Sequence, residues 1–315
     1  MSADRPVCIV DLTRRFRQRT ALDALCLDIN AGELFGFLGP NGSGKSTLFR
    51  ILATLLPPSS GSASIWGLDV VSDAEAIRHR LGVVFQSPAL DDMLTVRENL
   101  MHQGHLYGRH GQTLRRRVQD LMERFHVADR RDDRVGTLSG GLQRRVDLAR
   151  GILHEPDVLL LDEPSTGLDP GARRDLWNEL AHLRQETGLT ILVTTHLMAE
   201  GERCDRVAIL DQGHLVALAP PATLRQELGG SVVIVRTTNP EEFRRQVRTR
   251  FDLEARVLDG SVRIEHTDGH GLVPRLAAAF PEQITSLTVQ APTLEDVFAH
   301  RTGRTFDAAA SDLPG

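Results

Sequence analysis

The sequence is almost without lysine: of its 37 lysine and arginine residues, only Lys45 is a lysine. Lysine carries a compact point charge on a thin stem, whereas the arginine guanidinium is a wide planar fork. A position that holds lysine where arginine serves everywhere else is therefore one that only the compact charge fits. A loop whose backbone N–H groups surround a phosphate chain is such a place.

An excess of positive charge is also missing, because the formal net charge is −5 at pH 7. Proteins that bind nucleic acid present a basic surface, so we expect no nucleic-acid partner. Cysteine is scarce as well. The three cysteines, Cys8, Cys26 and Cys204, lack the spacing of a metal site, and we predict buried thiols in a reducing cytoplasm.

Long apolar runs are absent, since none approaches the roughly 20 residues that span a bilayer. The first residues, MSADRPVCIV, lack the basic start and the apolar stretch of a secretory signal peptide. We therefore expect that the chain does not cross a membrane by itself, which leaves binding to a membrane partner open. The sequence contains no second phosphate-binding loop and no internal repeat.

Lys45 follows a buried strand and begins a helix. The apolar run Leu34–Leu38 predicts a strand buried on both faces, and a helix is predicted from Lys45 to Leu55, before Pro57-Pro58. A strand, a glycine-rich loop and a helix in this order are the context of a P-loop.

In a P-loop, backbone N–H groups and the helix N-terminus bind the phosphates of a nucleotide. Lys45 should reach the β- and γ-phosphates, and the Ser46 hydroxyl should bind Mg²⁺. Thr47 is expected to bond a phosphate oxygen. The residues of this predicted nucleotide-binding loop are Gly39, Pro40, Asn41, Gly42, Ser43, Gly44, Lys45, Ser46 and Thr47.

Two acidic residues end a second apolar strand, Val158–Leu161. An unpaired carboxylate is costly there, and a bound cation removes that cost, so Asp162 is predicted to hold Mg²⁺. Glu163 is then placed to polarise an attacking water. Taken alone, such a pair would more often start a loop or cap a helix, but the upstream P-loop favours the functional interpretation.

Strands and helices alternate along the rest of the chain, which predicts a largely parallel sheet with its site at the strand ends. The first elements are predicted as a strand over Val7–Leu12, a turn around Phe16 and a strand over Ala24–Ile29. The stretch from 73 to 136 is predicted to be mainly helical. Further strands are expected over Leu189–Thr195, Val207–Leu210 and His214–Ala217, the last two as a hairpin.

A linker is predicted at Gly229-Gly230, so that a first domain covers residues 1–229 and a second covers 230–301. The second shows the order βαββαβ, which is typical of a ferredoxin-like unit. Its predicted elements are Ser231–Arg236, Pro240–Arg250, Glu254–Leu258, Ser261–Glu265, Gly271–Phe280 and Ile284–Val289, followed by a helix over Leu294–Arg301. Residues 302–315 are predicted to be a tail, disordered from Asp307.

Six motifs together resemble the nucleotide-binding subunits of ATP-binding-cassette (ABC) transporters. Besides the P-loop, they are Val84-Phe85-Gln86-Ser87-Pro88 (Q-loop), Leu138-Ser139-Gly140-Gly141-Leu142-Gln143 (signature), Leu159-Leu160-Leu161-Asp162-Glu163-Pro164 (Walker B), Ser165-Thr166-Gly167-Leu168-Asp169 (D-loop) and Thr194-Thr195-His196 (switch). The fifth signature residue, often Gln in the family, is Leu142 here. The resemblance implies an α/β P-loop NTPase cassette, with a RecA-like core and antiparallel β and helical subdomains, plus the small C-terminal α+β domain.

The resemblance also assigns roles that spacing alone does not show. Ser139, Gly140 and Gly141 would bind the γ-phosphate of ATP held by a second copy of the chain, so that a homodimer sandwiches two ATP molecules. Gln86 would contact Mg²⁺ and the attacking water, His196 would contact the γ-phosphate, and Phe16 would stack on adenine. The implied catalytic residues are Glu163, His196 and Gln86, and the implied metal ligands are Ser46, Gln86 and Asp162.

The segment Pro292–Phe298 resembles the end of daunorubicin-resistance-type exporter ATPases, which pair with a separate ABC-2-type membrane permease. We therefore predict an ATPase that drives export of a drug-like, lipid or glycan substrate from the cytoplasmic face of the membrane, with ATP and Mg²⁺. Asp91, Asp92, Met93 and Leu94 are predicted to line the permease groove. A soluble cassette ATPase acting on ribosomes or DNA, or an importer subunit, remain alternatives.

Overall fold

The computed structural model describes residues 5–306, which divide into two compact units. The first comprises residues 5–37, 44–195 and 212–214, and the second comprises 38–43, 196–211 and 215–306. The predicted tail from Asp307 lies outside the described residues. The boundary predicted at residue 229 remains a prediction.

The first unit contains an antiparallel sheet of order β2-β1-β4-β5. Its strands are β1 (Val7–Phe16), β2 (Arg19–Ile29), β4 (Ser60–Ile65) and β5 (Leu68–Asp69). The turn predicted around Phe16 is formed by Arg17 and Gln18, between Phe16 and Arg19, which pair with each other. Strand β1 continues past the predicted end at Leu12 to Phe16. Register shifts along β1 let the strand bend and keep its pairing through the arginine-rich stretch.

Cys26 corrects the prediction of buried thiols. It is exposed, whereas Cys8 is partly buried and Cys204 is buried. Side chains alternate between the faces of a strand, so the inward positions Leu25 and Leu27 place Cys26 on the opposite face. There its thiol donates to the Asp11 carboxylate over 3.1 Å.

The first unit also contains the predicted parallel strands, in the hydrogen-bonded order β3-β8-β7-β6. They are β3 (Leu34–Leu38), β6 (Leu81–Val84), β7 (Val158–Asp162) and β8 (Thr190–Thr195). Every residue of β3, β7 and β8 is buried, as expected for strands covered on both faces. The stretch from 73 to 136 was predicted as mainly helical, and β6 is the strand that this prediction missed.

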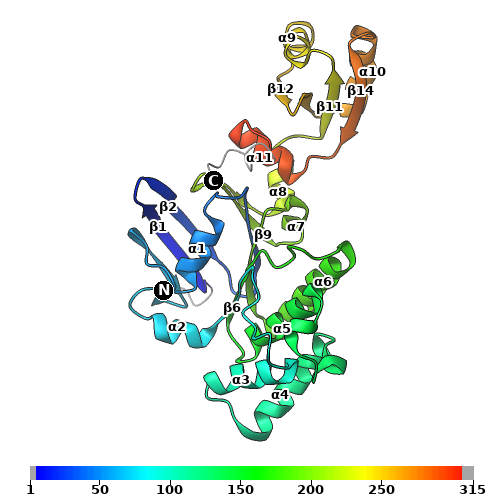
Figure 1. The fold of residues 1–315 in the computed structure, drawn as a ribbon. Helices are drawn as coiled ribbons and strands as arrows, with labels where there is room; N and C mark the ends of the chain where they lie inside the picture. The colour runs from blue at the N-terminus through cyan, green and yellow to red at the C-terminus, as the bar shows by residue number, and fades with distance from the viewer. Residues whose placement is uncertain (1–4, 307–315) are drawn as a thin grey trace. The chain divides into compact units, whose positions relative to one another are not determined.

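Helices and short 3₁₀ turns complete the first unit (Figure 1). They are α1 (Lys45–Leu52), α2 (Ala74–Arg80), α3 (Val96–Leu106), α4 (Gly111–Arg124), η1 (Ala128–Arg130), η2 (Val135–Thr137), α5 (Gly140–Ile152) and α6 (Pro170–Thr187). Helix α1 ends before the predicted Leu55, because Thr54 takes a left-handed φ of 61° and the N–H of Leu55 turns back to the Arg50 carbonyl.

After residues 38–43, the second unit contains α7 (Met198–Gly201), β9 (Arg206–Asp211), β10 (His214–Ala219) from Leu215 onward, and α8 (Pro221–Gln226). The predicted hairpin is present as β9 and β10, which are neighbours in one sheet. Because Asp211 and His214 are separated by two residues, the turn between the strands is tight.

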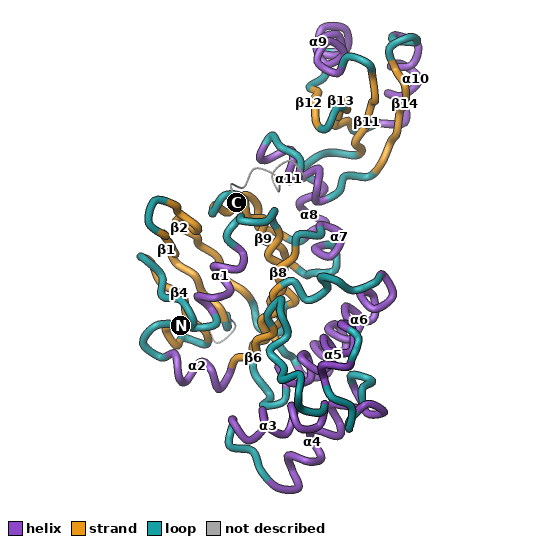
Figure 2. Tube along the Cα trace, in the orientation of Figure 1, coloured by secondary structure: helices purple, strands orange, loops and turns teal. Residues whose placement is uncertain are grey.

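The C-terminal part of the second unit has all the predicted elements in the predicted order (Figure 2). They are β11 (Ser231–Thr237), α9 (Pro240–Phe251), β12 (Ala255–Leu258), β13 (Ser261–His266), α10 (Gly269–Ala279), β14 (Ile284–Gln290) and α11 (Leu294–Thr302). The antiparallel order β12-β13-β11-β14 is the ferredoxin-like arrangement. Helices α9 and α10 close its core with Phe243, Val247, Leu272 and Leu276.

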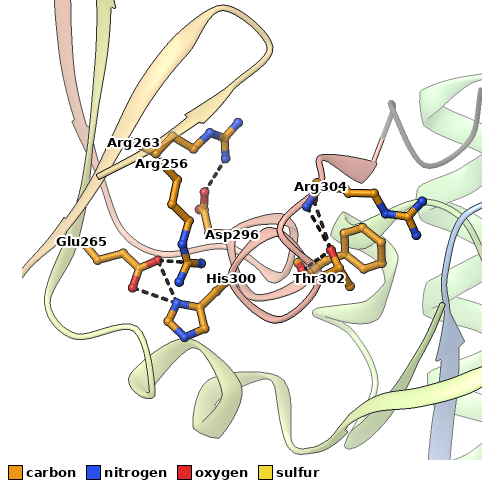
Figure 3. A network of polar contacts seen from close by, with 8 residues as sticks. Arg256, Arg263, Glu265, Asp296, His300, Thr302 and Arg304 are labelled. Atoms are coloured by element: carbon orange, nitrogen blue, oxygen red, sulfur yellow. Dashed lines mark hydrogen bonds and ion pairs between the residues drawn. The ribbon is translucent and has the colours of Figure 1, made fainter. Parts of the chain in front are cut away.

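Polar contacts attach α11 to this small sheet (Figure 3). The carboxylate of Asp296 accepts a hydrogen bond from Arg263 of β13, and His300 lies 3.0 Å from Glu265 of the same strand. At the other end, Arg304 lies 2.6 Å from Asp211 of β9. The last helix is therefore tied at both ends within the second unit.

Candidate functional site

The P-loop follows β3, and glycine is required at two of its positions. A Cβ on Gly39 would collide with the Leu210 carbonyl oxygen. Gly44 has a φ of 109°, and its Cβ would lie 2.5 Å from the Ala21 carbonyl oxygen. Side chains other than hydrogen would force these loop segments away from their neighbours. Glycine at these two positions therefore lets the loop keep the tight backbone conformation that wraps a phosphate chain.

Helix α1 begins at Lys45, and its first turn carries no acidic residue, which suits an anion at its N-terminus. In the same loop, the Ser43 hydroxyl is buried, and no hydrogen-bond partner for it is present among residues 5–306. An unpaired buried hydroxyl is unfavourable unless a ligand supplies the partner. Both observations fit a bound phosphate.

Lys45 is buried, with 4% of its surface exposed. Burial lowers the pKa of its ammonium group to about 8, and the negative charges of Glu163 and Asp162 oppose this shift. The charges of the two acidic residues therefore act on the lysine. Added phosphate charges would favour the protonated lysine further.

Asp162 ends β7 and is 8% exposed. Its carboxylate accepts a hydrogen bond from Thr194 over 2.5 Å and one from the Ser46 hydroxyl over 3.5 Å. The Ser46 hydroxyl and the Asp162 carboxylate thus converge, as the predicted Mg²⁺ site requires. Residues 5–306 contain no cluster of three or more His, Cys, Asp or Glu that could hold a metal.

Glu163 has a left-handed backbone, with a φ of 46°. Its N–H donates to the Thr194 hydroxyl over 2.9 Å, and its carboxylate accepts from Thr166 over 3.1 Å. A non-glycine residue in this region is strained, and such strain is concentrated at functional sites. Hydrogen bonds to the backbone and to the side chain of Glu163 therefore both fix its orientation.

The remaining predicted residues lie at the end of a strand or shortly after one. Gln86 is exposed two residues after the end of β6, and His196 is half-buried directly after β8. Phe16 is 42% exposed at the end of β1, with the Arg14 guanidinium 4.6 Å from its ring centroid. The roles assigned to Gln86, His196 and Phe16 stay predictions.

The signature begins α5. Ser139 caps this helix, its hydroxyl accepting from the Leu142 N–H over 3.4 Å. Ser139 and Gly140 are exposed, and Gly141 is partly exposed. The Gln143 amide bonds back to the Val135 carbonyl over 3.1 Å, so the glutamine beside Leu142 supports the loop that precedes the helix.

Sequence reasoning gave no role to Thr194 or Arg144. Thr194 lies opposite Asp162 in the register of β7 and β8, and its hydroxyl links Asp162 to the Glu163 backbone. Arg144 donates to backbone carbonyls on both sides of Glu163. Thr194 could have been noticed because it belongs to the switch motif and lies near the end of an apolar strand.

Comparison with known proteins places this site in a family. A family model described as "ABC transporter" matches residues 22–166. The Nod factor export ATP-binding protein I of Neorhizobium galegae is 40% identical over 309 residues, covering 96% of this chain and 87% of that protein. The daunorubicin resistance ATP-binding protein DrrA3 of Streptomyces coeruleorubidus is 36% identical over 308 residues, covering 96% of this chain and 97% of that protein.

Solved structures of ATP-binding cassettes are also similar to this chain. The dimeric ATP-binding cassette MJ0796, in a post-hydrolysis state with ADP and Pi, aligns with a TM-score of 0.63 and 28% identity. The match covers 68% of this chain and 98% of that one. ATP-binding subunits of exporters work as dimers with a separate membrane permease, and they use ATP with Mg²⁺.

The family predicted from the six motifs is confirmed, and neither the soluble cassette nor the importer is favoured. Between residues 5 and 306, none of the helices has the length and apolar character needed to cross a bilayer. The chain belongs to the ABC transporter family, as an ATP-hydrolysing subunit of the daunorubicin-resistance exporter type.

Proposed function

We propose that two copies of this chain sandwich two ATP molecules and drive export of a drug-like, lipid or glycan substrate through a separate ABC-2-type permease. The chain would act at the cytoplasmic face of the membrane. The observation that carries the ATPase part is the convergence of Lys45, Asp162 and Glu163 beside the P-loop. The relatives named for Nod factor export and daunorubicin resistance support the substrate classes.

Each residue has a stated task in this proposal. Lys45 neutralises the β- and γ-phosphates, Glu163 polarises the attacking water, and His196 contacts the γ-phosphate. Mg²⁺, held by Ser46, Asp162 and Gln86, would supply charge neutralisation between the β- and γ-phosphates. In the partner copy, Ser139, Gly140 and Gly141 bind the same γ-phosphate at the N-terminus of α5. Phe16 stacks on the adenine.

The replacement Glu163→Gln tests the ATPase part. The variant should bind ATP, form a stable dimer in size-exclusion chromatography with light scattering, and fail to hydrolyse ATP. Glu186→Gln is the matched control, since its side chain is 62% exposed on α6. Normal turnover by Glu163→Gln would remove Glu163 from its assigned role.

The permease would dock on the segment from Ser87 to Gly108, between the Q-loop and α4. Met93 is 68% exposed and Leu106 is 67% exposed in this segment, which supports an apolar contact with a membrane partner. Asp91, Asp92 and Leu94 flank Met93 in the loop that precedes α3. Co-purification of a polytopic membrane protein with the wild-type chain, and its loss in Met93→Asp, would test this surface. ATP-driven uptake of daunorubicin by inside-out vesicles would separate export from import.

The ferredoxin-like domain would regulate or stabilise the ATPase dimer. The deletion of all residues after Gly230 should then change dimerisation, or the coupling of hydrolysis to transport. Unchanged ATPase activity, dimerisation and transport in the truncated chain would reject this role.

A further inference from the structure

Helix α5 carries a buried arginine that the described mechanism does not use. Arg144 is 5% exposed, and the carboxylate of Asp147, one turn further along the helix, lies 3.8 Å away. Burial lowers the pKa of Arg144, and the negative charges of Asp147 and Asp162 oppose that shift. Burying a guanidinium costs free energy unless its N–H groups make hydrogen bonds. The acceptors of these hydrogen bonds therefore identify the segments that Arg144 holds in place.

The donors of Arg144 bind three backbone carbonyls from two separate motifs. Its Nε donates to the Pro164 carbonyl over 2.8 Å and its Nη2 to the Asp162 carbonyl over 3.2 Å. Its Nη1 donates to the Phe85 carbonyl over 2.5 Å. Because the guanidinium is planar and rigid, its three contacts fix the end of β7 and the start of the Q-loop relative to each other.

Glu163 lies between two of these carbonyls. Its left-handed φ of 46° is strained, and such a conformation persists only where surrounding contacts enforce it. Arg144 binds the carbonyls of the residues before and after Glu163, Asp162 and Pro164, and the Thr194 hydroxyl accepts from the Glu163 N–H. The third carbonyl belongs to Phe85, whose neighbour in the chain is Gln86. One side chain therefore binds the carbonyl of the residue that directly precedes each of the two residues proposed to handle the attacking water.

Arg144 also lies on the helix that begins with the signature. Ser139 caps α5, and Arg144 follows it little more than one turn later. We propose that Arg144 is a positioning residue for ATP hydrolysis, which fixes Glu163 and Gln86 relative to the signature helix. The proposal rests on the proposed role of Glu163, although the contacts that it invokes can be tested without catalysis.

Arg144→Met tests the proposal against a structural role of the arginine in α5. The matched control is Arg150→Met, because Arg150 lies on the same helix and also pairs with Asp147, over 2.9 Å. Its other hydrogen bonds go to Gln103 and to the Val83 carbonyl rather than to the backbone around Glu163. Both variants remove a largely buried charge partner of Asp147, so both should lower the melting temperature.

The two variants should differ in turnover. We expect Arg144→Met to lower kcat about 30-fold or more with KM changed less than about threefold, because a misplaced catalytic group affects the chemical step. Arg150→Met should keep kcat within about threefold of wild type. Arg144→Lys should be intermediate, since one ammonium cannot donate along all three directions of the fork. Equal losses of kcat in Arg144→Met and Arg150→Met, or wild-type kcat in Arg144→Met, would overturn the proposal.

Hydrogen exchange separates this proposal from that for Glu163. In the full-length, nucleotide-free chain, Arg144→Met and Arg144→Lys should speed amide exchange in residues 162–166 and 85–87, whereas Arg150→Met should not. Unchanged exchange in both segments would overturn the positioning role. If Glu163→Gln still hydrolysed ATP, the assigned role of Glu163 would fail, while the exchange result would still report whether Arg144 holds these segments.

Discussion

The Thr194 hydroxyl lies 2.5 Å from the carboxylate of Asp162 and donates a hydrogen bond to it. The two residues face each other in the parallel pairing of β7 and β8. The same hydroxyl accepts from the N–H of Glu163 over 2.9 Å. One threonine thus orients the carboxylate proposed to hold Mg²⁺ and the backbone of the glutamate proposed to activate water.

Thr194→Val removes this hydroxyl while keeping the shape of the side chain. The Asp162 carboxylate then keeps the 3.5 Å hydrogen bond from Ser46, and the Glu163 N–H keeps the 3.2 Å bond to the Thr194 backbone carbonyl. Each of the two lost hydrogen bonds contributes about 1 kcal/mol. We expect kcat to fall and the Mg²⁺ concentration for half-maximal ATPase activity to rise, each by about tenfold. Thr194→Ser is the matched control, since it keeps the hydroxyl. A magnesium titration that gives the same midpoint for Val and Ser variants would contradict the assignment.

Lys45→Arg is the conservative replacement that best tests the role of Lys45, because every other lysine or arginine position of the chain holds arginine. Lys45 is buried at the start of α1, so the wider guanidinium would displace the phosphates or the loop. We expect a folded protein with a melting temperature near that of wild type and at least about 100-fold lower ATP turnover. Wild-type turnover would show that the single lysine is an accident of composition.

The affinity for ATP should depend on pH through Lys45. Its pKa in the nucleotide-free protein is about 8, below the 10.5 of an unperturbed lysine. Below pH 8 the Lys45 side chain is protonated, and folding includes the full free-energy cost of burying its charge. From pH 8 to 10.5 the folded protein loses the proton before the unfolded chain does, so this group then favours the folded state increasingly as pH rises.

ATP binding has the opposite dependence, because phosphates favour the protonated lysine. The dissociation constant of MgATP should rise by about tenfold per pH unit once the pH exceeds 8. Calorimetry at pH 8.5 in two buffers of different ionisation enthalpy should show proton uptake on binding. Lys45→Arg keeps its charge and serves as the control. Equal proton uptake in both proteins would assign the effect to another group.

Apolar strands and the P-loop could be predicted because their signals are local. Leu34–Leu38 and Val158–Leu161 are continuous apolar runs, and the C-terminal domain alternates cleanly between strand and helix. Strand β6 was not predicted, because a strand of four residues between helices is too short to show a recognisable hydrophobic periodicity. The contact between Thr194 and Asp162 could not be predicted, because it depends on the register between β7 and β8, and neither strand's own sequence determines that register. Arg144 gave no signal in a chain where nearly every basic residue is arginine.

Asp296 should be the most sensitive single position for the attachment of α11. Its buried carboxylate accepts from the Thr293 N–H over 2.9 Å, from the Thr293 hydroxyl over 2.8 Å and from Arg263 over 2.5 Å. Asp296→Ala therefore removes a capping box and leaves Arg263 without this partner. We expect a loss of about 3 kcal/mol, the low end for a broken buried pair because the Arg263 side chain is 22% exposed.

The loss should be confined to the second unit. Amide exchange in residues 231–302 should accelerate in Asp296→Ala, whereas the melting curve followed by tryptophan fluorescence should not move, since Trp66 and Trp177 both lie in the first unit. Glu241→Ala is the control, because its side chain is 63% exposed and its pair with Arg244 should contribute less than about 1 kcal/mol. Exchange as slow in Asp296→Ala as in Glu241→Ala would show that α11 is held by its apolar contacts instead.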